Sequence, residues 1–512
     1  MLLFDLWPVQ AVLIRSGSTT MALQKLPFRS LIDIDRNSST PIFKQVANGI
    51  IQLIESGKIR PGYRLPASRD MSTIMKLNRT TIVAAYDEMC AEGWAEVLGK
   101  KGIFISKRLP IIKPKSFGID LMKGDGDVSL PTFYNKVTFS RPPSRELKPY
   151  QLIINDGYPD QRIAPITLIL DRYKALLNKP SFHGKLMKES SSGNQALRRE
   201  LSIFLSATRA LNIETENVLV THGAQLAIFI AASMVLKPGS TVVVGDLNYV
   251  LADKLFEQLG AKLIKVEVDE NGIDVDAIET ICKNSPPDLL YVIPHHHHPT
   301  TVTLSADRRQ KLLELVKRYK FPVIEDDYDY DFHYENSPIL PLASADHSGY
   351  VLYIGSISKT LAPTIRLGYL VASADFILEA SKLKQLIEIR GDVLFEESVA
   401  QLFNKGDMQR HIRRSVKLYH ERRDQFCSML ETSMKDVLQF KTPLGGMAVW
   451  GTFDNDYSIP ELVKRLASKG IHMNDGSVYR YSTRINGIRL GFASLNQDEM
   501  SKFVSALAEV KC

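Results

Sequence analysis

From about Asn155 onward, short apolar runs alternate with stretches of helical period, and this alternation constrains the fold of the 512-residue chain more than any other feature. The runs hold four to six buried-type residues and end in polar or turn-forming ones, as in NVLVTHG, STVVVGD, DLLYVIP, FPVIEDD and VLYIGS. Helical stretches such as AQLAIFIAASMVL and ADRRQKLLELVKRY separate several of them. Buried strands that alternate with helices are typical of an α/β domain with a mainly parallel sheet. Ligands of such sheets bind at the carboxyl ends of the strands, where the polar residues fall here.

A lysine follows one of these runs, in the segment VLYIGSISKTLAPTIRLGYLV. A neutral lysine amine can form an imine with an aldehyde, which makes Lys359 a candidate nucleophile. Hydroxyl groups and an arginine close to it suit a phosphate held by two hydrogen bonds, and the free N–H groups at the helix start in THGAQLA suit the same group. The candidate phosphate ligands are Ser356, Ser358, Arg366, Gly223, Ala224 and Gln225.

Two other strand ends carry side chains that suit a nitrogen-containing aromatic ring. In IEDDYDYDF, Asp326 ends a buried run and Tyr328 lies on the same face two residues on. A carboxylate that pairs with a pyridinium nitrogen keeps it protonated, so the ring continues to withdraw electrons. The Tyr328 phenol can hydrogen-bond an oxygen of such a ring, and Tyr249, at the end of GDLNY, can stack on it.

The N-terminal part of the chain differs in charge from the rest. The whole chain has 64 Lys and Arg against 57 Asp and Glu, a net charge of +7. Twelve of the basic and six of the acidic residues lie between Arg36 and Arg108, so nearly all of the excess belongs to this short segment. A concentrated positive charge indicates an anionic partner for the segment.

Apolar residues at helical spacing predict two helices in this basic segment, one in IFKQVANGIIQLIESG and one in NRTTIVAAYDEMCAEG. A further short helix begins near Ser68 in LPASRDMSTIMKL. The second long helix displays Arg79, Thr80 and Thr81 at its start, which suits the docking of a helix-turn-helix in a DNA groove. Two short strands follow, around the basic turn Gly99–Gly102, which we predict to be a wing that contacts phosphates through Lys100 and Lys101.

The segment from about residue 40 to residue 106 resembles the winged helix-turn-helix of the GntR family. The matching positions are Gly57, Arg60-Pro61-Gly62, Leu65-Pro66, Ser68-Arg69, Asn78-Arg79-Thr80-Thr81, Tyr86, Glu92-Gly93 and Gly102. The resemblance implies that Arg69, Arg79, Thr81 and the wing residue Gly102 contact an operator.

Residues from about 150 to 512 resemble the fold-type I aminotransferases, and the GntR-like head narrows the resemblance to the MocR subfamily of transcriptional regulators. It implies pyridoxal 5′-phosphate as cofactor, with Lys359 as the lysine that binds it covalently, Asp326 as the partner of the ring nitrogen and Tyr328 as the partner of the ring oxygen. It also implies that Tyr249 stacks on the ring and that the six phosphate ligands form a cup. NGIRLGFAS matches the motif whose arginine holds a substrate carboxylate, here Arg489.

The loop IPHHHHPTT departs from the pattern of many relatives, which have Ser-His-Gln-aromatic-Pro-Thr-Gly there. His297 falls at the glutamine position, so we predict that it lies near the cofactor ring. Consecutive histidines cannot easily all face one ion, and no carboxylate or cysteine stands at ligand spacing, so no metal site is predicted. In relatives that respond to γ-aminobutyrate an arginine lies two residues after the stacking tyrosine; here that residue is Leu251, which weakens the case for that effector.

These observations predict an N-terminal extension (1–35), a winged helix-turn-helix domain (36–108), a linker (109–150) and an aminotransferase-like domain (151–512). The last would be an α/β domain with a smaller α+β subdomain at about 395–512. Met21 is a possible alternative start. The four cysteines form no CxxC pair, which favours a reducing cytoplasm, and no membrane span or signal peptide is expected.

The leading hypothesis is a homodimeric regulator that binds operator DNA and senses pyridoxal phosphate or an amino-acid-like effector. The alternative is a working aminotransferase that acts on an amino acid and a 2-oxo acid, since Lys359, Asp326 and Arg489 are the parts that transamination requires. A third hypothesis, in which the large domain only dimerises, leaves the cofactor residues unexplained. The sequence does not identify the target genes, the effector, or activation as opposed to repression.

Overall fold

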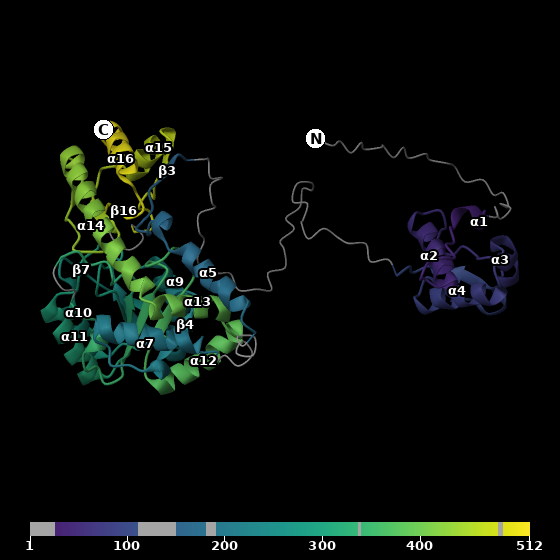
Figure 1. Ribbon diagram of the computed structural model, residues 1–512, viewed down its shortest axis with the longest axis horizontal. Coiled ribbons are helices and arrows are strands. Elements are labelled where there is room, and N and C mark those ends of the chain that lie inside the picture. The colour runs from purple at the N-terminus through teal and green to yellow at the C-terminus, as the bar shows by residue number, and fades with distance from the viewer. Residues whose placement is uncertain (1–25, 111–149, 181–190, 336–338, 480–484, 512) are drawn as a thin grey trace. The chain divides into compact units, whose positions relative to one another are not determined.

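The computed structural model describes residues 26–110, 150–180, 191–335, 339–479 and 485–511. The chain divides into two compact units, Met1–Pro131 and Thr132–Cys512, which are described separately below (Figure 1). The finer boundaries expected from the sequence remain predictions. Within the described ranges, no helix combines the length and the apolar character needed to cross a membrane.

The N-terminal unit is a small helical domain with a two-stranded wing, which confirms the predicted winged helix-turn-helix. Its elements are α1 (Phe28–Leu31), α2 (Ile42–Glu55), α3 (Ser68–Met75), α4 (Arg79–Ala91), β1 (Ala95–Val97) and β2 (Ile103–Ile105). The apolar stripes of α2 and α4 pack together around Ile50, Ile82 and Tyr86, all of which are buried. Asn78 caps α4 by accepting a hydrogen bond from the Thr80 N–H at 3.3 Å.

A seven-stranded sheet forms the centre of the C-terminal unit, in the order β4-β12-β11-β10-β9-β5-β6. Its strands are β4 (Val218–Thr221), β5 (Thr241–Gly245), β6 (Lys262–Val266), β9 (Leu289–Val292), β10 (Val323–Asp327), β11 (Val351–Ser356) and β12 (Gly368–Val371). β12 runs antiparallel to both of its neighbours, and the other described pairs are parallel. The predicted mainly parallel sheet is therefore confirmed.

Helices cover both faces of this sheet (Figure 1). They are α5 (Ile166–Leu177), α7 (Gln195–Arg209), α8 (Ala224–Val235), α9 (Val250–Gln258), α10 (Val275–Asn284), α11 (Ala306–Tyr319), α12 (Ala374–Glu388) and α13 (Val393–Asn404). Successive strand residues point to opposite faces. Val242 and Val244 accordingly belong to the core under α8 and α9, whereas Val243 belongs to the core under α10 and α11.

A separate core lies in the C-terminal part of the same unit. It contains the long helix α14 (Asp407–Met434), β13 (Gln439–Phe440), β14 (Ala448–Thr452), α15 (Ile459–Ser468), β16 (Gly487–Gly491) and α16 (Gln497–Val510). The short strand β3 (Leu152–Ile153) pairs in parallel with β15 (Ile471–His472). The segment that follows β3 therefore starts beside the C-terminal core, whose residues are far from it in the sequence.

Strand register brings the chemically important strand ends together. β10 and β11 are parallel neighbours, with Asp326 opposite Ile354, so the carboxyl end of β10 lies beside the loop that carries Lys359. On the other side, Gly368 of β12 packs against the loop before α8: a Cβ at Gly368 would lie 2.6 Å from the carbonyl carbon of Gly223. The close backbone approach requires glycine at position 368.

We expect Phe426→Ala to lower the free energy of unfolding of the C-terminal unit by about 3–5 kcal/mol, because large-to-small changes leave a cavity in a packed core. Phe426 is fully buried on α14 and stacks on Phe503 of α16, with ring centroids 6.2 Å apart. Chemical denaturation followed by circular dichroism measures the change. Ile203→Ala, on the exposed side of α7, is the control and should change stability by less than about 0.5 kcal/mol. Equal effects of the two variants would contradict the packing described.

Candidate cofactor site

Lys359 lies in the loop after β11, where its amine is removed from bulk water. Its Nζ donates a hydrogen bond to the Gly157 carbonyl oxygen at 2.6 Å and lies 4.6 Å from the centre of the Tyr158 ring. Burial lowers the pKa of Lys359 to about 8, with the nearby carboxylate of Asp156 acting in the opposite direction. A substantial fraction of the amine is therefore neutral near physiological pH, as a nucleophilic lysine requires.

Asp326 is buried at the end of β10 and has an unfilled acceptor. Tyr291 donates a hydrogen bond to Oδ2 at 2.7 Å, whereas Oδ1 is buried with no hydrogen-bond partner among the described residues. Burial, reinforced by Asp327 and Asp329, raises the pKa of Asp326 to about 7. Buried polar atoms normally have a partner, so the open Oδ1 fits a protonated ring nitrogen, which would also stabilise the ionised carboxylate.

Tyr328 and Arg489 come together from distant parts of the sequence. The Tyr328 hydroxyl donates to the His296 carbonyl oxygen at 2.7 Å and accepts a hydrogen bond from Nη2 of Arg489 at 3.2 Å. Arg489, on β16, is buried and also donates from Nη1 to the Pro299 carbonyl and from Nε to the Asp156 carbonyl, both at 2.8 Å. The structure thus fixes this guanidinium next to the predicted ring-oxygen partner.

The predicted phosphate ligands meet only in part. Gly223 has a φ of +83°, and a Cβ there would lie 2.6 Å from Nη2 of Arg366, so the arginine lies directly against the start of α8. The Ser356 hydroxyl oxygen accepts a hydrogen bond from the Ser358 N–H at 3.2 Å. The Ser358 hydroxyl, in contrast, donates to the Ile365 carbonyl at 2.5 Å, which braces the loop.

The amide of Gln225 completes this region. Its Nε2 donates to the Leu251 carbonyl oxygen at 3.4 Å, and its Oε1 is buried with no partner among the described residues. Ala224 begins α8, so its N–H belongs to the first turn, where backbone donors are free for an anion. Helix start and guanidinium together make a cradle that fits a phosphate.

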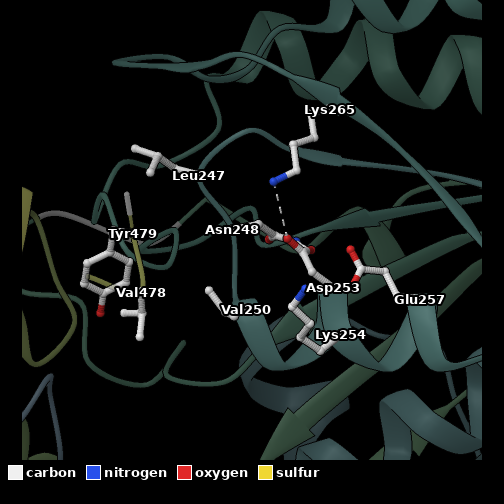
Figure 2. Close-up of a pocket in the computed structure, with 9 residues that line it drawn as sticks. All are labelled: Leu247, Asn248, Val250, Asp253, Lys254, Glu257, Lys265, Val478 and Tyr479. Carbon is white, nitrogen blue, oxygen red and sulfur yellow. Dashed lines mark hydrogen bonds and ion pairs between the residues drawn. The ribbon is translucent and has the colours of Figure 1, made fainter. Parts of the chain in front are cut away.

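Tyr249 is positioned by the residues that flank it. Its ring meets that of His298 edge to face, with centroids 5.5 Å apart. On the preceding residue, Nδ2 of Asn248 donates to Oδ1 of Asp253 at 2.6 Å, and Lys265 lies 4.0 Å from the other oxygen (Figure 2). These contacts border a small hollow that Val478 and Tyr479 close on the far side. The loop that carries Tyr249 is therefore anchored on α9 and β6.

His298 is the histidine whose ring contacts Tyr249. His297 is buried with Nδ1 2.9 Å from Thr300 Oγ1, and burial lowers its pKa to about 3, so it is neutral. Nε2 of His298 lies 3.9 Å from Oδ2 of Asp156, and its ring centroid lies 6.0 Å from that of Tyr479. The cofactor role given to His297 remains a prediction, and His298 is an addition that sequence reasoning missed.

The other two histidines of the run pair with acids at and just after the end of β10: His295 with Asp327 at 3.4 Å and His296 with Asp329 at 2.9 Å. Across the described ranges, no cluster of three or more His, Cys, Asp or Glu side chains is arranged to hold a metal ion. The four consecutive histidines are thus distributed among separate partners.

The segment Asn155–Tyr158, directly after β3, was not predicted to belong to the site. Its Gly157 carbonyl contacts Lys359, its Asp156 faces His298, and Gly491 of β16 donates a backbone hydrogen bond to Asn155 at 2.7 Å. The sequence signal for this part of the site was the same as for the other strand ends, namely polar residues after an apolar run. It was too weak to use because the strand has only two residues. We call this segment the strap.

On the N-terminal unit, the predicted DNA-binding residues share one region. Arg69, Arg79 and Thr80 are exposed, Thr81 is half-buried, and Nε of Arg79 donates to the Ser68 hydroxyl at 3.4 Å. A hollow of about 230 Å³ lies between the start of α3, Val83 of α4 and Gly102 of the wing.

The wing turn itself is the 3₁₀ segment Gly99–Lys101, which ends at Gly102 with a φ of +108°. Lys101 is exposed, as a phosphate contact requires, whereas the side chain of Lys100 lies outside the described part of the structure. The positive φ explains why glycine follows the turn.

Residues 183–507 match the family described as aminotransferase class I and II, and residues 43–105 match the family described as bacterial regulatory proteins, gntR family. The chain is 24% identical over 488 residues to the probable rhizopine catabolism regulatory protein MocR of Rhizobium meliloti, covering 93% of this chain and 95% of the relative. It is 26% identical over 483 residues to the pyridoxine biosynthesis transcriptional regulator PdxR of Corynebacterium glutamicum, covering 93% and 98%.

Among solved structures, kynurenine aminotransferase of Pyrococcus horikoshii is similar with a TM-score of 0.67 and 26% identity, over 74% of this chain and 96% of that one. The similarity to the two regulators extends over both units, whereas the similarity to the enzyme covers about three quarters of the chain. The order of the two units along the chain is therefore that of regulators.

Carbamylation of Lys359 by cyanate should rise with pH through a midpoint of about 8, because cyanate reacts with the neutral amine and burial lowers the pKa of Lys359. An ordinary exposed lysine rises through about 10.4. Mass spectrometry of the peptide that contains Lys359, on protein freed of small ligands, gives the profile. A midpoint at the ordinary lysine value would contradict the burial of this amine.

Proposed function

The chain belongs to the aminotransferase class I and II family and carries a GntR-type DNA-binding domain at its N-terminus, and from this premise we propose a transcriptional regulator that senses an amino compound at a pyridoxal 5′-phosphate site. The family is pyridoxal-phosphate-dependent, and the relatives that match both units are helix-turn-helix regulators of the MocR and PdxR type.

The observation that carries the proposal is the constellation of Lys359, Asp326 and Arg489. A half-buried amine with a lowered pKa lies in the same site as a buried carboxyl with an open acceptor and a buried guanidinium. When bound, pyridoxal phosphate supplies an aldehyde that can be attached covalently to an amine and a ring that withdraws electrons. In this proposal Lys359 holds the aldehyde carbon, Asp326 the ring nitrogen, and Tyr328 the ring oxygen.

The remaining site residues support binding from other sides. We assign Arg366 and the N–H groups at the start of α8 to the phosphate, and the ring of Tyr249 to the face of the cofactor. Arg489 would hold the carboxylate of the effector. Because each of these groups is fixed by hydrogen bonds or packing within the chain, the site needs little reorganisation to accept its ligands.

Operator binding is assigned to α3, α4 and the wing. Arg79 and Thr80 lie exposed at the start of α4, the end of a recognition helix that usually contacts base edges. Arg69 and Lys101 supply positive charge for phosphates. We place the protein in the cytoplasm, where a DNA-binding protein of this type meets the genome.

A homodimer would present two DNA-binding units to two half-sites. Exposed apolar residues of α12 and of the residue after it support it: Leu386 is 86% exposed, Ile389 is 68% exposed, and Ile387 and, two turns before Leu386, Leu378 are exposed as well. Clustered exposed apolar side chains of this kind mark protein contacts more often than solvent-facing surface. We propose that a second copy of the chain covers them.

A second function, transamination, is favoured by one specific observation. Arg489 contacts Tyr328 and the strap that holds Lys359, so a carboxylate bound there would place an amino acid beside the lysine. Lys359 can also move a proton, since its pKa of about 8 allows both protonation states near neutrality. Turnover of an amino acid and a 2-oxo acid, measured with the full-length protein, would show whether catalysis accompanies regulation.

Lys359→Ala should abolish the visible absorption of the protein-bound cofactor, because that absorption requires covalent attachment to the lysine. The measurement is an absorbance spectrum of the purified variant after incubation with pyridoxal phosphate and removal of the excess. Lys382→Ala, an exposed lysine of α12, is the matched control and should remain yellow. A yellow Lys359→Ala protein would contradict the assignment.

Arg79→Ala should weaken operator binding by about 1–3 kcal/mol if Arg79 reads a base edge. Genomic fragments captured by the full-length protein, with and without pyridoxal phosphate, would supply the operator, and a gel-shift titration would give the affinity. Arg29→Ala removes the same charge from the exposed part of α1 and should change the affinity little. Unchanged operator affinity of the Arg79 variant would contradict the assignment of α4 as the helix that recognises bases.

A further inference from the structure

The strap brings a carboxylate into the site that neither the cofactor nor its attachment uses. Arg489 donates to the carbonyl oxygen of Asp156 and Lys359 to that of the next residue, Gly157, and the Asp156 side chain is one-third exposed. Among the described residues, its ion-pair partner is His298, whose Nε2 lies 3.9 Å from Oδ2, beyond a normal hydrogen-bond distance. The carboxylate therefore keeps acceptor capacity for a ligand.

Asp156 is ionised at neutral pH. Burial by itself would raise its pKa, but His298, Lys359 and Arg489 outweigh it and hold the pKa well below the ordinary value for an aspartate. Under the proposed function, the two basic side chains near Asp156 interact with other groups: Arg489 would bind an effector carboxylate, and Lys359 would bind the cofactor. Once both are engaged, His298 is the only other group among the described residues that lowers the pKa of the Asp156 carboxyl.

Two further features beside Asp156 suit a cationic, hydrogen-bonding group. Nδ1 of His298 is buried and has no hydrogen-bond partner among the described residues. The ring of Tyr158, two residues further along the strap, already has an ammonium 4.6 Å from its centre, that of Lys359. An aromatic face attracts such cations by roughly 0.5–2 kcal/mol. The Asp156 carboxylate thus has the His298 ring on one side, and the Tyr158 ring lies two residues along the same strap, beside Lys359.

Resting on the proposed function, we infer that Asp156 is a specificity-determining residue that selects an effector with a second, cationic amine in its side chain, that is, a diamino acid. The α-carboxylate of such an effector would bind Arg489, and its distal ammonium would lie against Asp156 and Tyr158. The same carboxylate repels an effector with a second acidic group, so selection works by attraction and by repulsion.

The test uses full-length protein loaded with pyridoxal phosphate and follows the visible spectrum of the bound cofactor as amino acids are added. L-2,4-diaminobutyrate, L-ornithine and L-lysine are compared with their uncharged counterparts L-2-aminobutyrate, L-norvaline and L-norleucine, and with L-glutamate. We expect at least one diamino acid to bind tenfold or more tightly than its uncharged counterpart, and L-glutamate to bind more weakly than both.

Variants identify the residue responsible. Asp156→Asn removes the charge with little change of shape and should reduce the preference to less than about threefold, a loss of at least 0.7 kcal/mol. Asp156→Glu keeps the charge and should keep a preference. Asp171→Asn, on the exposed side of α5, removes the same charge elsewhere and should leave the preference unchanged.

An undiminished preference in Asp156→Asn, a preference for the uncharged or acidic ligands, or no spectral response to any amino acid would overturn the inference while the yellow protein still supported cofactor binding. If the loaded wild-type protein were colourless, the proposed function would fail and the inference with it. The comparison of ligands on wild-type protein decides the matter even where a variant does not fold.

Discussion

The C-terminal unit depends on the burial of two ionisable groups, the Lys359 amine and the Asp326 carboxyl, at the ends of two adjacent strands. β10 and β11 are hydrogen-bonded in parallel, so Asp326 and the loop of Lys359 have a fixed separation in register. Burial moves both pKa values toward neutrality, to about 7 and about 8. A ligand with a protonated ring nitrogen and an electrophilic carbon can interact with both groups at once, the nitrogen with Asp326 and the carbon with Lys359. The helices and β12 support the phosphate cradle beside these two residues.

Much of this arrangement could be predicted because it follows from local patterns. Five apolar runs with polar ends predicted strands whose carboxyl ends meet, and Lys359, Asp326, Tyr328 and Arg489 do come together in the structure. The strap could not be predicted in the same way. β3 has two residues, too few for a periodic pattern, and it is placed by pairing with β15, more than three hundred residues later.

The histidine run shows a second limit of sequence reasoning. Adjacent side chains in an irregular loop can face any direction, and here a positive φ of 44° at His296 turns the chain so that four neighbours have four different partners. Which of them faces the site depends on that turn, not on the residue type. The motif pointed to His297, whose cofactor role remains a prediction, and it gave no signal for His298, the residue that contacts Tyr249.

The contact between Gly368 and the Gly223 loop has a consequence for the history of this protein. Every substitution at position 368 adds at least one carbon atom, and that atom would overlap backbone rather than a movable side chain. No compensating change of a neighbouring side chain can make room for it. Descendants of this chain that keep the cradle must therefore keep a glycine codon at position 368, however far the sequence of the DNA-binding domain diverges.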